Sequence, residues 1–105
     1  MITKEEKELL QTAINEYGCC LQQDVAIEEM SELTKAIIKF RRSFVGFNQQ
    51  RISPELKEVL RSDIAEEVAD VLIMMEQLKL IYDIEEDVEK WKEKKLNRLK
   101  ERLNS

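Results

Sequence analysis

The chain has 105 residues, of which 43% are hydrophobic and 37% are charged, and its formal net charge is −5. This length suits a single domain covering residues 1–105, and the acidic total argues against a protein that binds nucleic acid through a basic face. No stretch approaches the roughly 20 apolar residues of a membrane span, and the polar N-terminus does not resemble a signal peptide, so we expect a cytoplasmic protein without membrane contact.

The composition also limits the fold class and the chemistry. Only two glycines and one proline occur, which favours helices over sheet. Cys19 and Cys20 are adjacent and cannot join distant parts of the fold, so we expect two small buried residues. The absence of histidine excludes Ser–His and Cys–His nucleophile systems. Any reaction must therefore use carboxylates, cations and metals.

The first two predicted helices cover the N-terminal part of the chain. Thr3 followed by Glu6 fits a capping box, so the first helix begins near residue 3, and Gly18 suits its end. The second helix covers about residues 21–42 and is apolar on two sides, which predicts packing against more than one neighbour. One stripe contains Ala26, Met30, Leu33, Ile37 and Phe40, and the other contains Ile27, Thr34 and Ile38.

A polar and aromatic loop at residues 43–53 separates these helices from the last two. Ser53 as N-cap and Pro54 as the first helical residue begin a third helix that runs to about residue 81. Asp83 with Glu86 fits another capping box and is predicted to begin the fourth helix. That helix continues to about residue 103 and is expected to carry Val88 and Trp91, together with Ile84, inward.

Acidic residues interrupt the apolar seams of the second and third helices. Glu29 and Glu32 lie at helical spacing between Val25 and Ala36, so they share one strip with apolar residues. On the third helix Glu67 occupies the middle of an apolar seam, and Asp70 lies at its edge. The other members of that seam are Leu60, Ile64, Val71, Met74 and Leu78.

A glutamate buried without a partner is costly, and four facing carboxylates repel one another. A divalent cation compensates directly, because hard oxygen ligands suit Mg²⁺ or Mn²⁺. Acids at helical spacing also occur on ordinary solvated faces, so at this point a metal site and a solvated face both stay open. A di-iron or di-manganese carboxylate bundle is disfavoured, because that pattern normally includes a Glu-x-x-His pair.

The fourth helix adds positive charge. Lys95 and Arg98 continue the stripe of Ile84, Val88 and Trp91 at helical spacing. Two explanations stay open: the side chains extend past the end of a bundle or pair with acids, or they reach phosphate oxygens.

These residues resemble those of the MazG-type, all-α nucleoside triphosphate pyrophosphohydrolases. The family pattern is EExxE on one helix and ExxD on the next, and it stands here as E28-E-M-S-E32 and E67-V-A-D70. The resemblance extends through the D83-I-E-E turn to the basic last helix and covers about residues 17–103. It implies an antiparallel bundle of four or five helices, completed by association into a homodimer or homotetramer.

The resemblance also implies a reaction and a set of roles. A nucleoside triphosphate would be cleaved between its α- and β-phosphates to a monophosphate and pyrophosphate, as in removal of unwanted nucleotides from the pool. Mg²⁺ would be held by four acids, and two further acids would add a ligand or position the attacking water. The four are Glu29, Glu32, Glu67 and Asp70; the further two are Glu28 and Glu66.

Substrate contacts are expected from the last helix. Lys95 and Arg98 would hold phosphate oxygens, on the same or a neighbouring subunit. The family often carries a Lys-x-Asn-like pattern there, which makes Asn97 a further candidate, although on a helical wheel Asn97 points away from the stripe. Gln22, Gln23 and the aromatic residues at 44–47 are candidates for contacting the base.

Two alternatives accompany this hypothesis. The first is a non-catalytic helical oligomerisation module that binds a metal or nucleotide without turnover. The second is a related specialist for phosphoribosyl-ATP or for one deoxynucleotide such as dUTP or dCTP.

Overall fold

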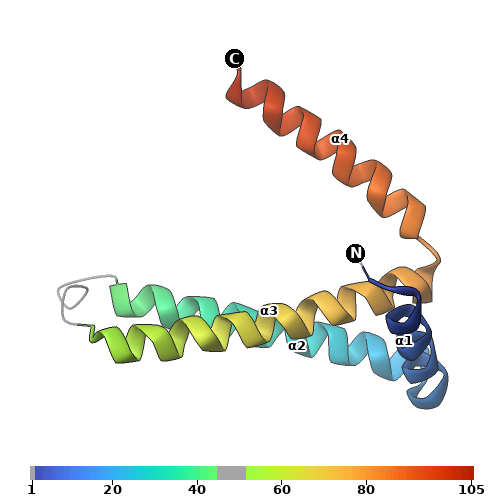
Figure 1. Cartoon of the computed structure of the whole chain (residues 1–105), viewed down its shortest axis with the longest axis horizontal. Helices are drawn as coiled ribbons and strands as arrows, with labels where there is room; N and C mark the ends of the chain where they lie inside the picture. Colours follow the sequence, from blue (N-terminus) through green and yellow to red (C-terminus); the bar gives the residue numbers. More distant parts are fainter. Residues whose placement is uncertain (1, 45–51) are drawn as a thin grey trace.

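Four α-helices make up the regular structure in a computed structural model that describes residues 2–44 and 52–105 (Figure 1). They are α1 (Lys4–Tyr17), α2 (Cys19–Phe44), α3 (Pro54–Tyr82) and α4 (Glu85–Leu103). No strand occurs among the described residues, which confirms the expected all-α class. Most of the predicted loop, residues 45–51, lies outside the described part of the chain.

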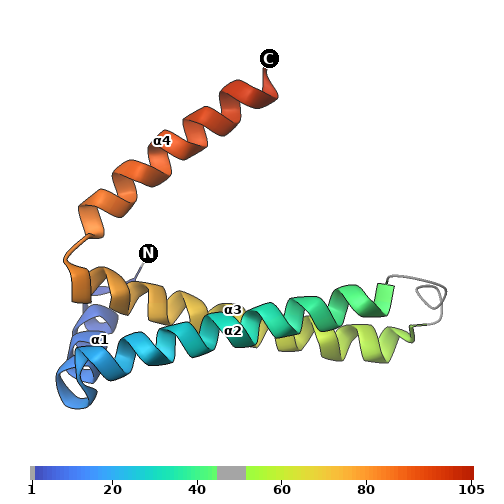
Figure 2. The ribbon, with the colours of Figure 1, turned by 180° about the vertical axis from the view of Figure 1, so that it is seen from behind.

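Helices α2 and α3 form a long hairpin, and α1 and α4 join it at the same end. α2 and α3 lie side by side and antiparallel, as both views show (Figures 1 and 2). α1 crosses the end of the hairpin at which α2 begins and α3 ends, and it contacts both helices. α4 leaves the same end and projects away, so its backbone approaches only α3. The expected bundle is therefore not closed within one chain.

The ends of α1 form as the sequence predicts. The Thr3 side chain accepts a hydrogen bond from the Glu6 backbone N–H, and the Glu6 side chain accepts one from the Thr3 N–H. Gly18 ends the helix with its N–H donating to the Ile14 carbonyl, and its own carbonyl accepts from the Gln22 N–H of α2. Gly18 has φ +92°, a conformation that side-chain-bearing residues rarely adopt. One glycine thus makes the whole turn between α1 and α2.

The two ends of α3 differ in how well the sequence predicts them. Ser53 caps the N-terminus by accepting from the Leu56 N–H, with Pro54 as the first helical residue. The prediction that Asp83 begins α4 is wrong. Asp83 instead ends α3 in the left-handed conformation, with φ 54°, and its N–H donates to the carbonyls of the last turn. Aspartate tolerates this conformation better than most residues, so the same side chain suits either role.

The core lies along the α2–α3 seam and beneath α1. Ile14, Ala26, Leu60 and Met74 are buried, and Ile64, Val71 and Leu78 are half-buried between them. The predicted α3 seam is therefore confirmed, as is the inward position of Ala26.

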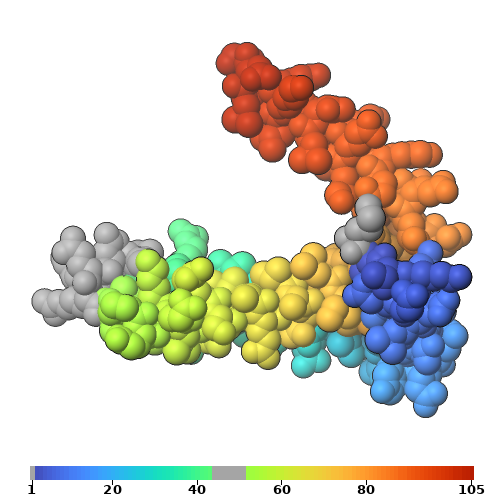
Figure 3. Space-filling model, viewed as in Figure 1, coloured from blue at the N-terminus to red at the C-terminus, as the bar shows by residue number. Residues whose placement is uncertain are grey.

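Several predicted core residues are exposed within this chain. Trp91 is 53% exposed because α4 stands clear of the hairpin, as the space-filling view shows (Figure 3). Ile27 and Ile38, from the second apolar stripe of α2, are also exposed. The expectation of buried cysteines is wrong: Cys19 and Cys20 are exposed, since they lie in the first turn of α2 where no other helix covers them. No helix in the described part of the chain is long and apolar enough to cross a membrane.

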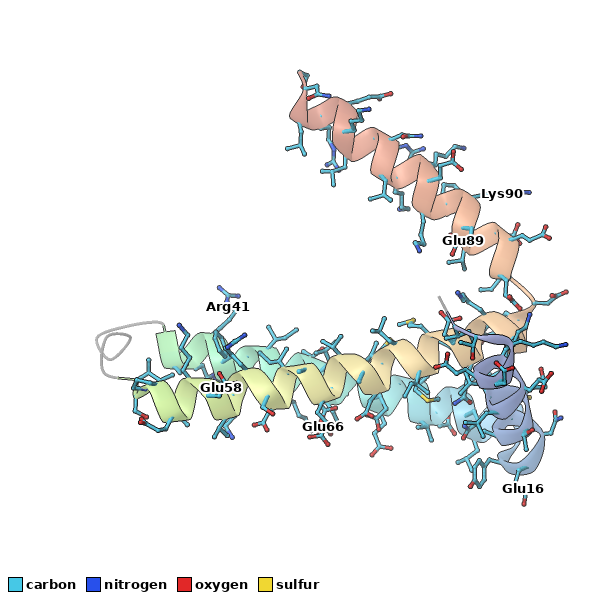
Figure 4. The ribbon with its side chains drawn as sticks, viewed as in Figure 1. Glu16, Arg41, Glu58, Glu66, Glu89 and Lys90 are labelled. Carbon is cyan, nitrogen blue, oxygen red and sulfur yellow. The ribbon has the colours of Figure 1, made fainter. Side chains whose placement is uncertain are left out.

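We expect Gly18→Ala to lower the free energy of unfolding by about 1 kcal/mol, because alanine disfavours the backbone conformation of this turn. Steric contact does not add to the cost, since an added Cβ meets nothing within 4 Å. Thermal unfolding should show a midpoint about 5 °C lower. Glu16→Ala, at an exposed position of the same helix (Figure 4), is the control and should change little. An unchanged midpoint in Gly18→Ala would contradict this account of the turn.

Candidate metal centre

Three carboxylates converge on the seam between α2 and α3. Glu29 comes from α2, and Glu67 and Asp70 come from adjacent turns of α3. Each offers a carboxylate oxygen, and the three oxygens lie within 4.8 Å of one another. The convergence follows from the helical spacing that places acids among the apolar residues of each seam. We call these three residues the acid cluster.

Glu67 is the most constrained member of the acid cluster. Its Oε2 atom is buried and has no hydrogen-bond partner. A buried carboxylate oxygen without a donor is costly, because it has lost water and gained nothing in return. Natural proteins satisfy such an atom with a proton, a water molecule or an ion.

The electrostatics of the acid cluster disfavour full ionisation. Burial raises the pKa of the Glu67 carboxyl, and the nearby Asp70 and Glu32 raise it further. Burial also raises the pKa of Glu29, with further contributions from the charges of Asp70 and Glu67. Both groups therefore hold protons more tightly than an exposed glutamate does.

Glu32 lies beside the acid cluster without joining it. Its charge contributes to the raised pKa of Glu67, so the two carboxylates are close enough to repel. Its own Oε1 pairs with Lys35 Nζ at 3.4 Å, one turn along α2. The structure thus brings together three of the four expected metal ligands and leaves the fourth adjacent.

The two acids expected to act on water are solvent-exposed. Glu28 and Glu66 precede members of the acid cluster in the sequence, and Glu66 points outward from α3 (Figure 4). Their charges still act on the centre: Glu28 contributes to the raised pKa of Glu29, and Glu66 to that of Glu67.

The expected phosphate-binding residues lie on α4, away from the acid cluster of the same chain. Lys95 and Arg98 line one surface hollow together with Arg102. Asn97 lines a different hollow with Lys100 and Asn104, which agrees with its direction on a helical wheel. Because α4 projects away from the hairpin, one chain does not combine these cations with the acids (Figure 4).

Two residues expected to contact a base, Gln22 and Gln23, form side-chain hydrogen bonds to residues of α3. Gln22 is buried and donates through Nε2 to Gln77 Oε1 at 2.7 Å, so the expectation that it meets a base is wrong. Gln23 accepts a hydrogen bond from the Tyr82 hydroxyl. The aromatic side chains at 44–47 lie outside what the structure describes. Periodicity within α2 gives no indication of the buried partner of Gln22, which lies on another helix.

The donor set of the acid cluster fits a hard divalent cation. Oxygens around an octahedral Mg²⁺, at about 2.1 Å from the ion, are separated by about 3–4 Å, which is compatible with three oxygens that lie within 4.8 Å of one another. A cation would also supply the partner that Glu67 Oε2 lacks. Mn²⁺ takes similar oxygen ligands, so the same residues suit either metal.

No protein-family model, no curated protein and no solved structure matches this chain. The resemblance to the MazG-type enzymes therefore rests on the order and spacing of the two acidic motifs. The chemistry of the centre rests on the carboxylates themselves.

The raised pKa values of Glu29 and Glu67 predict how stability depends on pH. The folded chain binds these protons more tightly than the unfolded chain, so the stabilisation is fully present below the ordinary glutamate pKa and is lost as pH rises through the raised values. Without metal, we expect the midpoint temperature of thermal unfolding to fall as the pH is raised from about 4.5 to about 7.5. Mg²⁺ should restore it, and its effect should be larger at the higher pH.

The matched variant is Glu67→Gln, which removes a charge from the seam with little change in shape. Its metal-free midpoint at neutral pH should exceed that of the wild type, and Mg²⁺ should raise it less. Glu55→Gln, on the exposed first turn of α3, serves as the control. Equal Mg²⁺ effects in Glu67→Gln and the wild type would show that the ion does not act at this centre.

Proposed function

We propose that the protein is a Mg²⁺-dependent nucleotide pyrophosphohydrolase. It would consume one water and convert a nucleoside or deoxynucleoside triphosphate to the monophosphate and pyrophosphate, clearing unwanted nucleotides from the cytoplasm. The observation that carries the proposal is the acid cluster, with its carboxylate oxygens within 4.8 Å and one buried oxygen unpaired. The motif order EExxE then ExxD, which resembles that of the MazG-type enzymes, supports it.

The roles of the acids follow from their positions. Glu29, Glu67 and Asp70 would hold the cation, and Glu32 would join them by exchanging its exposed ion pair with Lys35 for the metal. A bound cation would neutralise phosphate charge and lower the pKa of a water molecule bound to it. Glu28 or Glu66 would orient that water or accept its proton, a role that suits their exposed positions beside the cluster.

Phosphate binding in this proposal requires a second chain. Residues 90–102 contain seven lysines and arginines and two glutamates, which leaves −10 on the rest of a chain whose net charge is −5. A basic helix that projects from an acidic body is suited to pack on another copy of that body. Lys95 and Arg98 of one subunit would then lie near the acid cluster of its neighbour, with Asn97 a weaker candidate for substrate contact.

Exposed apolar residues support the same association. They occur along α4 (Trp91, Leu96, Leu99 and Leu103), on the second stripe of α2 (Ile27 and Ile38) and on α3 (Leu72 and Ile73). A large amount of exposed apolar surface is typical of an interface. Packing of these faces between copies would complete the bundle in a dimer or a pair of dimers.

The activity is tested with purified protein, Mg²⁺ and a panel of ribo- and deoxynucleoside triphosphates. Resolving monophosphate from diphosphate, with pyrophosphate measured separately, identifies the bond that is cleaved. We expect Glu67→Gln and Asp70→Asn to lower kcat/KM at least about 100-fold while helicity is kept, because each removes a charged ligand. Glu55→Gln should retain wild-type activity. Full activity in both site variants would refute the assignment.

The panel also separates the proposal from its rivals. Metal binding without any product would favour the non-catalytic module. Turnover confined to dUTP, dCTP or phosphoribosyl-ATP would indicate a specialist with the same metal centre.

Association is tested by sedimentation equilibrium over a roughly hundredfold range of concentration. We expect a mass of two or four chains of 12.4 kDa. Leu99→Glu, at an exposed position of the α4 apolar face, should weaken association at least about tenfold, because it places a charge in the interface. Asn104→Asp adds the same charge beyond the end of α4 and should not. A wild-type monomer at every concentration would contradict the two-chain arrangement.

A further inference from the structure

A buried pair of amides lies on the same helical seam as the acid cluster. Gln22 is 7% exposed and Gln77 is 4% exposed, and the Gln22 amide donates to the Gln77 carbonyl oxygen at 2.7 Å. The Gln77 amide in turn contacts Met74 Sδ at 3.7 Å. Gln22 and Gln77 are the polar residues among those that are buried in the described part of the chain.

The spacing between this pair and the acid cluster is the same on both helices. Gln22 precedes Glu29 by seven residues, and Gln77 follows Asp70 by seven residues. Seven residues make close to two helical turns, so both amides return to the face that carries the acids. In the antiparallel hairpin, the amide pair therefore lies about 10 Å from the cluster along the same seam.

Apart from the exposed hydrogen bond from Tyr82 to Gln23, the other side-chain contacts between α2 and α3 constrain their alignment less than the buried amide pair does. Apolar side chains such as Met30, Leu33 and Val71 make contacts without a preferred direction, so they tolerate a shift better than a hydrogen bond does. Nine residues separate the end of α2 at Phe44 from the start of α3 at Pro54, and a connection of that length is compatible with more than one alignment. In the metal-free chain, the carboxylates act against the native alignment when they are ionised, because their charges then repel one another.

A shift of one helical turn would displace α2 along α3 by about 5.4 Å. That displacement exceeds the 4.8 Å within which the three carboxylate oxygens lie, so it would take Glu29 out of the acid cluster. The same shift would separate Gln22 from Gln77 and leave two buried amides without partners, which is costly. The amide pair therefore penalises a shift that would move Glu29 away from Glu67 and Asp70.

We infer that Gln22 and Gln77 are positioning residues that set the register of α2 against α3 and thereby hold Glu29 opposite Glu67 and Asp70. This inference rests on the proposed metal centre for its functional meaning. A polar pair that specifies register within an apolar interface is a well-attested use of buried polar groups.

The test replaces both amides by methionine, which has nearly the same length and shape. Gln22→Met/Gln77→Met should stay helical and unfold at the same temperature or higher, because removing both partners leaves no buried group unpaired. The dissociation constant for Mn²⁺ should nevertheless rise about tenfold, as expected when the native register is only about one-tenth populated. A residue that only filled the core would change stability and metal affinity together.

Register is measured directly by electron paramagnetic resonance distances between nitroxide labels. Ser31→Cys on α2 and Ser62→Cys on α3 are exposed attachment sites, in a chain whose Cys19 and Cys20 are replaced by serine. The labelled chain is mixed with an excess of unlabelled chain, so that labels on different subunits do not contribute, and we expect one intrachain distance in the otherwise unchanged protein. The double methionine variant should show a second population, in which α2 is displaced by about 5 Å along α3.

Tyr82→Phe is the matched control, because it removes an exposed α2–α3 hydrogen bond, to Gln23, and leaves the buried pair intact. It should change neither Mn²⁺ affinity nor the label distances. The inference is overturned if the double variant keeps both a single native distance and wild-type affinity. Weaker affinity at unchanged distances overturns it too, and so does loss of folding, since the pair would then support the core rather than the register.

An error in the proposed function can be distinguished from an error in this inference. If the unchanged protein binds no Mn²⁺, the metal centre is refuted, while the label distances still decide whether the amide pair sets the register.

Discussion

The α2–α3 seam must hold two helices together and also bring carboxylates against one another. Apolar contacts near Ala26 and Met74 favour close approach, whereas ionised Glu29, Glu67 and Asp70 oppose it. Burial makes the opposition stronger, because repulsion is less screened there than in water. A hairpin whose only task was to fold would place aliphatic residues at these positions. Under the function proposed above, a positively charged ligand would offset this repulsion.

The acid cluster and the densest group of cations lie on different parts of the chain, although ion pairs form elsewhere among the described residues. The acids lie on the hairpin, and the densest group of cations lies on α4, which projects from it. Within one chain this leaves both surfaces exposed, together with the apolar residues beside them. In the association proposed above, α4 of one subunit would bring its cations to the acid cluster of the neighbouring copy, which its own α4 does not reach. Under the function proposed above, a substrate with several phosphates would bind at the boundary between such surfaces, where a metal and cations would both be available.

Local rules predict most of the fold and a large part of the candidate site. Capping chemistry locates the starts of α1 and α3, and helical periodicity alone places Glu29, Glu67 and Asp70 on apolar seams. The failures arise where two conformations or two environments suit one residue. Asp83 serves as a cap in either of two geometries, and Gln22 on a seam is equally a binding residue or half of a buried pair. Only the relative placement of helices decides these cases, and periodicity within one helix does not contain it.

The turn at Asp83 sets the direction in which α4 projects from the end of α3. Two residues, Asp83 and Ile84, separate α3 from a helix of 19 residues that is about 28 Å long. A rotation of about 10° at this pivot would carry the far end of α4 through about 5 Å, a full helical pitch. Close to this turn, Lys7 of α1 and Glu85 of α4 form an ion pair at 2.9 Å, which restrains the first turn of α4 relative to α1. The position of the distal cations thus depends on the backbone torsion angles of Asp83 and Ile84, which lie more than ten residues before Lys95 in the chain.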